Sequence, residues 1–137
     1  MSDKHPHEDG ASDERLAELL AAKTRPAEVR DTYLAAHRLV RGALSDVRWS
    51  TDLVDVATGY GAHQYGYGGW GMAALMAHAK WVSLVFMRAT ELDDRAGLLE
   101  GTGKALRHVK LRSLEELEAR RAALRDLVDQ AARLTAR

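Results

Sequence analysis

The chain contains no cysteine, which excludes several kinds of chemistry together. Without thiols there are no disulfides, no thiolate metal ligands and no cysteine nucleophile. The chain also lacks an excess of charge of either sign, because 20 Lys and Arg residues balance 20 Asp and Glu residues. A neutral chain has no overall field that attracts nucleic acid or an anionic membrane, so the composition argues against both as partners.

Long apolar runs are missing too. No window is apolar for long enough to span a bilayer, and the first residues, MSDKHPHEDGASDE, lack the apolar segment of a signal peptide. We therefore expect a cytoplasmic protein. With 137 residues, 46% of them hydrophobic, the chain is long enough to close one core. Residues 1–12 show no periodicity and are expected to form a flexible tail before a single domain at 13–137.

Three segments have a helical pattern. Ser12 and Asp13 are suited to cap a short helix, and Pro26 is suited to the first turn of a longer one. In that second helix apolar residues recur at helical spacing, which leaves His37 on the solvent side; they are Val29, Tyr33, Ala36, Val40 and Leu44. Ser113 followed by Glu116 forms a capping box before a long C-terminal helix.

The strands are concentrated in the second half of the chain. Residues 70–77 and 80–87 are two apolar runs typical of a β-hairpin, and residues 106–112 alternate as a half-buried strand. Residues 45–69 are rich in glycine and polar residues, which indicates a loop with one short strand. Helical segments come before and after the strands in the sequence, and the strands are expected to form a mainly antiparallel sheet. This order predicts a two-layer α+β fold in which the helices cover one face of the sheet.

That arrangement leaves the other face of the sheet uncovered. Trp81, like Val85 and Met87, belongs to the uncovered side of its strand, while the wet face of residues 106–112 carries His108, Lys110 and Arg112. An exposed aromatic and basic patch usually marks an interface, so Trp81, His108, Lys110 and Arg112 are candidate contacts for a partner protein or a second copy. A platform for single-stranded nucleic acid is a less favoured alternative.

Two short motifs suggest small charged ligands. Gly101, Thr102, Gly103 and Lys104 resemble the end of a phosphate-binding loop, although Leu98 and Ala105 replace the glycine and the Ser/Thr that a P-loop needs. The segment is therefore either a backbone anion nest or a plain turn. Glu91, Asp93 and Asp94 supply oxygen ligands for a hard divalent cation, or form a solvated acidic turn.

No set of residues in the sequence predicts catalysis. There is no Gly-x-Ser-x-Gly elbow and no pair of histidines at zincin spacing. We therefore expect no catalytic residues and favour a non-enzymatic binding protein.

The segments WGMAALMAHAKWVSLVFM and ELDDRAGLLEGTGKALRHVKL, with SLEEL after them, resemble the YdhG-like bacterial family, a domain of unknown function. The resemblance covers about residues 25–132 and implies a frataxin-like fold. It also implies a role as an iron chaperone that delivers ferrous iron to proteins of iron–sulfur assembly and haem synthesis. The counterparts of the frataxin acidic ridge would be Glu14, Glu18, Glu28 and Asp31.

Three hypotheses remain open at this point. The first is an iron(II)-binding protein that uses those acidic residues or the turn at 91–94. The second is an interaction module that docks a partner or forms a homodimer through the open sheet face. The third is an enzyme acting on a small anion at Lys104 and the basic strand.

Overall fold

One antiparallel sheet contains the six strands of the described residues, in the order β1-β2-β3-β4-β5-β6. The computed structural model describes residues 6–61 and 71–135. Its strands are β1 (His7–Asp9), β2 (Trp49–Asp52), β3 (Ala57–Tyr60), β4 (Ala73–Ala77), β5 (Val82–Phe86) and β6 (Arg107–Leu111). Its helices are α1 (Asp13–Ala22), α2 (Ala27–Ala43) and α3 (Leu114–Thr135), with a 3-10 turn, η1, at Ala89–Glu91.

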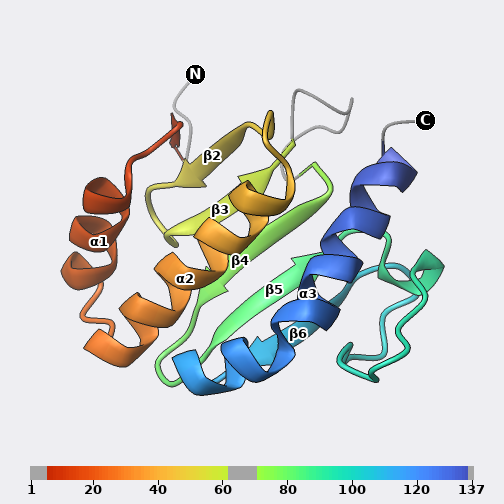
Figure 1. The fold of residues 1–137 in the computed structure, drawn as a ribbon. Helices are drawn as coiled ribbons and strands as arrows, with labels where there is room; N and C mark the ends of the chain where they lie inside the picture. Colours follow the sequence, from red (N-terminus) through yellow and green to blue (C-terminus); the bar gives the residue numbers. More distant parts are fainter. Residues whose placement is uncertain (1–5, 62–70, 136–137) are drawn as a thin grey trace.

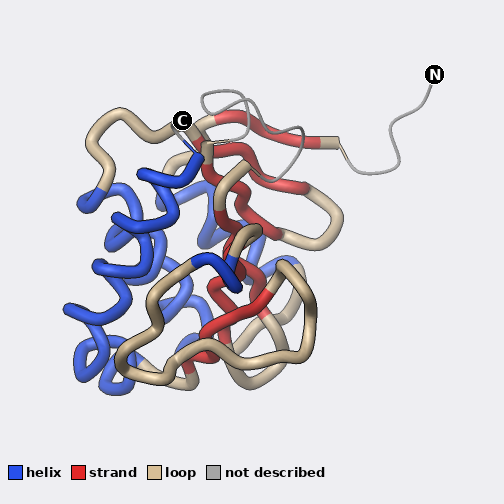
Figure 2. Tube along the Cα trace, turned by 90° about the vertical axis from the view of Figure 1, so that its right-hand side faces the viewer, coloured by secondary structure: helices blue, strands red, loops and turns tan. Residues whose placement is uncertain are grey.

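The helices lie on one side of this sheet. Helices α2 and α3 cross the same face, and α1 lies beside α2 near β1 and β2 (Figure 1). The side view separates a helical layer from a layer of strands and loops (Figure 2). The expected two-layer α+β architecture, with an antiparallel sheet and a long C-terminal helix, is confirmed.

The hydrophobic core lies between the two layers. Alternate strand residues face the helices, as in the cross-strand row Leu75, Leu84 and Val109. Their side chains are buried against apolar residues of α2 and α3, such as Val40 and Leu124. Each fully buried aliphatic side chain contributes about 1.5–3 kcal/mol by leaving water. Burial of this face fixes the register of the sheet, and thereby fixes which side chains face outward.

Several local predictions are confirmed. The Ser12 side chain accepts a hydrogen bond from the Arg15 amide at the start of α1. The expected β-hairpin forms from β4 and β5, with shorter strands than 70–77 and 80–87. Residues 80 and 81 lie in its turn, and residue 70 lies outside the described residues. At the start of α3 the Glu116 amide donates to Ser113 Oγ at 3.1 Å. The returning Glu116 carboxylate accepts from the Arg112 amide at 3.3 Å, one residue before the expected position.

The expected tail at residues 1–12 is wrong for its described part. β1 pairs with β2, and the Leu53 amide donates to the carbonyl of Pro6 at 2.9 Å. Arg15 of α1 forms an ion pair with Glu8 of β1, with Nε to Oε1 at 3.1 Å. Main-chain pairing along an open strand edge orders the segment, and such pairing depends little on side-chain pattern. Residues 1–5 lie outside the described residues.

The expected loop at 45–69 contains two strands rather than one. β2 and β3 pair over four residues each, and residues 62–69 of this stretch lie outside the described residues. The two strands lack an apolar pattern because their inner face carries hydroxyl groups. Thr51 and Thr58 face each other across the strands, and their Oγ1 atoms lie 3.0 Å apart.

The expectation that His37 faces solvent is also wrong. The residue is fully buried, and its Nδ1 lies 2.7 Å from the hydroxyl of Tyr60. His37 follows Tyr33 by four residues on α2, so it lies on the same face of the helix. A polar partner on β3 makes this burial tolerable.

Candidate functional site

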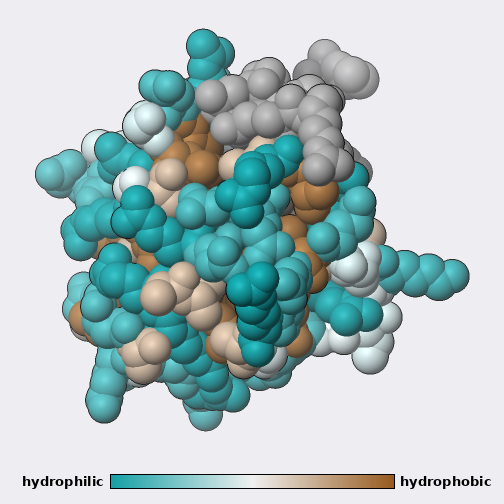
Figure 3. All heavy atoms as spheres, turned by 45° about the vertical axis from the view of Figure 1, so that its right-hand side comes forward, coloured by the Kyte–Doolittle hydropathy of each residue, from teal (hydrophilic) through white to brown (hydrophobic). Residues whose placement is uncertain are grey.

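The sheet face away from the helices carries a shallow hollow at its β5–β6 side. It has a volume of about 350 Å³ and is lined by Met76, His78, Trp81, Ser83, Val85, His108 and Lys110. We call these seven residues the β5–β6 patch. Three of the four predicted interface residues, Trp81, His108 and Lys110, therefore lie together. The helical side seen in Figure 3 is mostly hydrophilic, with apolar residues in small separate groups.

Strand register assembles the patch from three strands. Ser83 of β5 lies between Met76 of β4 and Lys110 of β6, and the next outward residue, Val85, faces His108. Side chains two residues apart on one strand point to the same face. The patch is thus two adjacent cross-strand rows on the uncovered side of the sheet.

The turn between β4 and β5 adds the aromatic end of the patch. The His78 amide donates to the Trp81 carbonyl at 2.8 Å and closes the turn. The rings of His78 and Trp81 are then 4.9 Å apart and tilted by 33°. Lys110 places its Nζ 4.7 Å from the Trp81 ring centroid, which is a cation–π contact. Trp81 is therefore held between the His78 ring and the Lys110 ammonium group.

Electrostatics in the patch favour anions. Burial lowers the pKa of His78, and the neighbouring charges of Arg25, His108 and Lys110 lower it further. The permanent charges among these neighbours, Arg25 and Lys110, are both positive. No carboxylate lines the hollow within the described residues. Glu100 lies beside the hollow, as the bridge partner of His108. An anionic group placed in the hollow would lie close to the Lys110 ammonium group.

Sequence reasoning missed His78, Ser83 and Met76 as members of the patch. The two apolar runs contain Met76 and Ser83 and leave His78 between them, which does not indicate that the three share a hollow. The turn at 78–81 is longer than the two residues between the runs, and it sets the alignment of β4 with β5 that brings their outward residues together. Arg112, the fourth predicted residue, is exposed and points to Glu116, with Nη1 to Oε1 at 3.5 Å, and does not line the hollow.

A hydrogen bond of 3.1 Å joins His78 Nε2 and Ser83 Oγ. This contact has the geometry of a base beside a hydroxyl nucleophile. A catalytic triad also needs a group that orients the second imidazole nitrogen, and the described residues show no such bond to His78. Ser83 is also only 4% exposed, so a substrate has little access to its hydroxyl. The contact is better suited to fixing the His78 ring against Trp81.

The acidic turn uses its carboxylates within the protein. Glu91 pairs with Arg88, with Oε1 to Nη2 at 2.7 Å, and Asp93 pairs with Arg95 at 2.8 Å. Asp94 accepts the amides of Leu98 and Leu99, both at 2.9 Å. A cation would have to displace these partners before it could bind.

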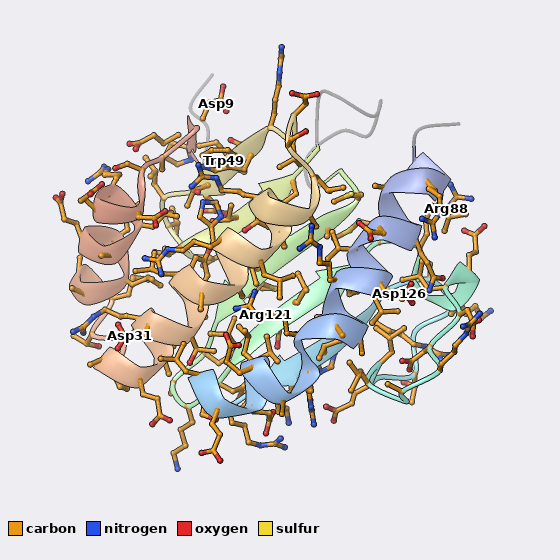
Figure 4. All side chains as sticks on the ribbon, viewed as in Figure 1. Asp9, Asp31, Trp49, Arg88, Arg121 and Asp126 are labelled. Atoms are coloured by element: carbon orange, nitrogen blue, oxygen red, sulfur yellow. The ribbon has the colours of Figure 1, made fainter. Side chains whose placement is uncertain are left out.

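The acidic residues of the first two helices are spread out. Glu14 lies in the first turn of α1, whereas Glu28 and Asp31 lie in the first turns of α2. Figure 4 places Asp31 at the outer end of α2, far from Asp126 on α3. Within residues 6–61 and 71–135 there is no group of three or more His, Asp or Glu side chains arranged to hold a metal ion.

The segment Gly101–Lys104 forms part of the connection between η1 and β6. Gly101 has a φ of +117°, which favours glycine, and Lys104 is exposed. Its described side-chain contacts use carbonyl groups: Thr90 Oγ1 donates to the Lys104 carbonyl at 2.8 Å, and Arg107 Nε donates to the Gly103 carbonyl at 3.2 Å. A turn stabilised through its carbonyl groups favours the plain-turn interpretation over an anion nest.

No helix among the described residues is long and apolar enough to cross a membrane. Comparison of the chain with protein-family models, with curated proteins and with solved structures gives no significant match.

Proposed function

We propose that this chain is a small binding protein that docks an acidic segment of a partner protein on the β5–β6 patch. The observation that carries the proposal is the convergence of Trp81, Lys110 and two histidines on an uncovered sheet face, with the Lys110 ammonium group against the Trp81 ring. Aromatic residues in partly buried hollows are typical anchors of protein interfaces. The surrounding positive charge selects acidic partners and accelerates encounter with them.

Charge also separates this occupant from a second copy of the chain. A two-fold symmetric contact through the patch would bring the Lys110 ammonium groups of both copies into one interface. Juxtaposed like charges cost free energy in a desolvated interface. An acidic segment instead neutralises them, and an aromatic or aliphatic side chain from it can occupy the hollow beside Trp81.

A defined peptide tests this proposal. The probe is the acetylated, amidated pentapeptide Glu-Glu-Phe-Glu-Glu, titrated calorimetrically into the full chain, with Lys-Lys-Phe-Lys-Lys as the control peptide. We expect Lys110→Glu and Trp81→Glu to weaken binding of the acidic peptide about tenfold or more, because they remove the central cation and the anchor. Lys104→Glu makes the same charge change outside the patch and should alter affinity less than about twofold.

The outcomes separate the alternatives. Equal affinity for both peptides, or equal loss in all three variants, would show that net charge alone controls binding and would overturn the proposal. Sedimentation of the free protein tests the homodimer. A dimer that Trp81→Glu dissociates without unfolding would assign the patch to a second copy instead of an acidic segment.

The frataxin-like fold and the ferrous-iron role implied by the YdhG-like resemblance stay separate proposals. Single carboxylates such as Glu18 provide hard oxygen ligands of the kind that suit iron(II). Without a gathered ligand set in the described residues, the geometry supports docking better than iron carriage.

A further inference from the structure

A second hollow lies on the other side of the molecule, at the C-terminal end of α2. Its volume is about 560 Å³, and it is lined by Arg38, Arg41, Gly42, Leu44, Ser45, Val47 and Trp49. We call it the α2 hollow. We propose that the α2 hollow binds a small organic anion whose carboxylate or phosphate group contacts Arg38 and Arg41 and whose apolar body lies against Leu44, Val47 and Trp49.

The two guanidinium groups are brought together by one carboxylate. Arg38 Nε lies 2.9 Å from Asp13 Oδ2, and Arg41 Nη1 lies 3.5 Å from Asp13 Oδ1. Two cations and one anion leave a net positive charge on the wall of the hollow, and no carboxylate lines it within the described residues. Each guanidinium carries five N–H donors in a planar fork. Donors therefore remain for an anion in addition to those that contact Asp13.

The aromatic wall is held in place from three directions. The Trp49 indole Nε1 donates to the Ala11 carbonyl at 3.0 Å, and the Arg41 guanidinium carbon lies 4.5 Å from the Trp49 ring centroid. The His37 ring meets the indole nearly perpendicularly, with centroids 5.1 Å apart. Figure 4 shows Trp49 between α1 and the C-terminal half of α2. A ring fixed in this way is a preorganised apolar surface.

One buried polar atom beside this wall has no hydrogen-bond partner and no ion-pair partner in the described part of the chain. It is His37 Nε2, on the ring that contacts Trp49. A buried polar atom without a partner is costly, and bound water or a ligand is a common reason for its presence. The unpartnered nitrogen therefore lies next to the tryptophan of the hollow, whose wall carries a net positive charge.

The size and chemistry of the wall set the ligand class. A hollow of this volume is in the range of small-molecule sites, which are mainly apolar with a few polar groups that fix orientation. Here the polar groups are the two guanidiniums and the Ser45 side chain. The two arginines near the C-terminus of α2 also stabilise the helix, because cations there interact favourably with the helix dipole. The test must therefore separate ligand binding from helix stability.

Benzoate and phenyl phosphate are the probes, and benzyl alcohol is the uncharged control. Binding is followed on 15N-labelled full-length protein through the indole N–H of Trp49 and the amides of residues 41–49. We expect Arg38→Gln and Arg41→Gln to weaken anion binding about tenfold each, because each removes a charge-assisted contact. Arg121→Gln, an exposed residue of α3 that pairs with Glu118, is the matched control and should leave affinity unchanged.

Asp13→Asn gives the sharper result. It neutralises the carboxylate that competes for both arginines, so anion affinity should rise about threefold or more even if the variant is slightly less stable. A purely structural role for the arginines predicts no such gain. The proposal is overturned if neither anion binds at about 10 mM, if benzyl alcohol binds equally well, or if Asp13→Asn does not tighten binding. The preferred probe, benzoate or phenyl phosphate, identifies the charged group of the ligand.

Discussion

At the scale of single residues, buried polar pairs join α2 to the middle of the sheet. The Tyr33 hydroxyl lies 2.6 Å from Thr58 Oγ1, and the Tyr60 hydroxyl lies 2.7 Å from His37 Nδ1. Burial raises the pKa values of both tyrosines well above their usual range. Tyr60 therefore keeps its hydroxyl proton, and the tautomer of the His37 ring decides whether Tyr60 or His37 Nδ1 is the donor. Periodicity predicted that Tyr33 is buried. Its partner Thr58 and the His37 partner Tyr60 lie in β3, which the sequence pattern indicated to be part of a loop, so neither pair could be predicted.

His37 should make stability depend on pH. Burial, with a further contribution from Arg41, lowers the pKa of His37 from 6.5 to about 4, so the folded protein keeps the ring neutral where the unfolded chain protonates it. Stability is then fully present above pH 6.5, falls as pH drops from 6.5 towards 4, and levels off below. Urea unfolding at pH 7 and pH 4.5 should differ by about 2 kcal/mol from this residue.

The comparison that isolates His37 uses two variants. His37→Phe should remove this part of the pH dependence, while His78→Gln, which alters a more exposed histidine, should change the slope only slightly. An unchanged slope in His37→Phe would show that other groups cause the loss of stability in acid.

At the scale of elements, apolar pattern decided which segments were predictable. The β4–β5 hairpin has two apolar runs, and β6 and α3 have periodic patterns. All three form where they are expected, although β4 and β5 are shorter than the runs. In contrast, β1, β2 and β3 consist largely of polar or small residues. Asp52 shows the difficulty, because it is a charged residue only 3% exposed whose Oδ1 accepts the Val54 and Asp55 amides. Asp52 stabilises the turn between β2 and β3, and this turn forms only when the two strands pair.

The connection between β5 and β6 offers a matched pair of acidic residues. Asp94→Ala should lower the free energy of unfolding by about 1–2 kcal/mol, because the amides of Leu98 and Leu99 lose their acceptor. Asp93→Ala removes only an ion pair with Arg95, whose side chain is 86% exposed, and should cost close to zero. Urea denaturation with an unchanged m-value is the measurement. An equal loss in both variants would contradict the structural role assigned to Asp94.

At the scale of the whole molecule, the two faces of the sheet differ in what covers them. The helical face forms the core, and the outer face exposes the β5–β6 patch at one side. Alternation along β6 was enough to predict that His108 and Lys110 share this face. Trp81 was expected on the strand but lies in the β4–β5 turn, which brings it to the same face. The hollow itself also needs His78, Ser83 and Met76, whose contributions follow from the turn and the strand register. The length of the turn and the register between strands could not be predicted from the pattern of any one strand.

Amide chemical-shift mapping tests the central claim most directly. The acidic Glu-Glu-Phe-Glu-Glu peptide is titrated into 15N-labelled full-length protein, and perturbed amides are located on the fold. We predict perturbations confined to the β5–β6 patch, with the largest at Ser83, Val85, His108 and Lys110 and none along α1 or the turn at 91–94. Perturbations located elsewhere, or none at saturating peptide, would contradict the proposed docking function.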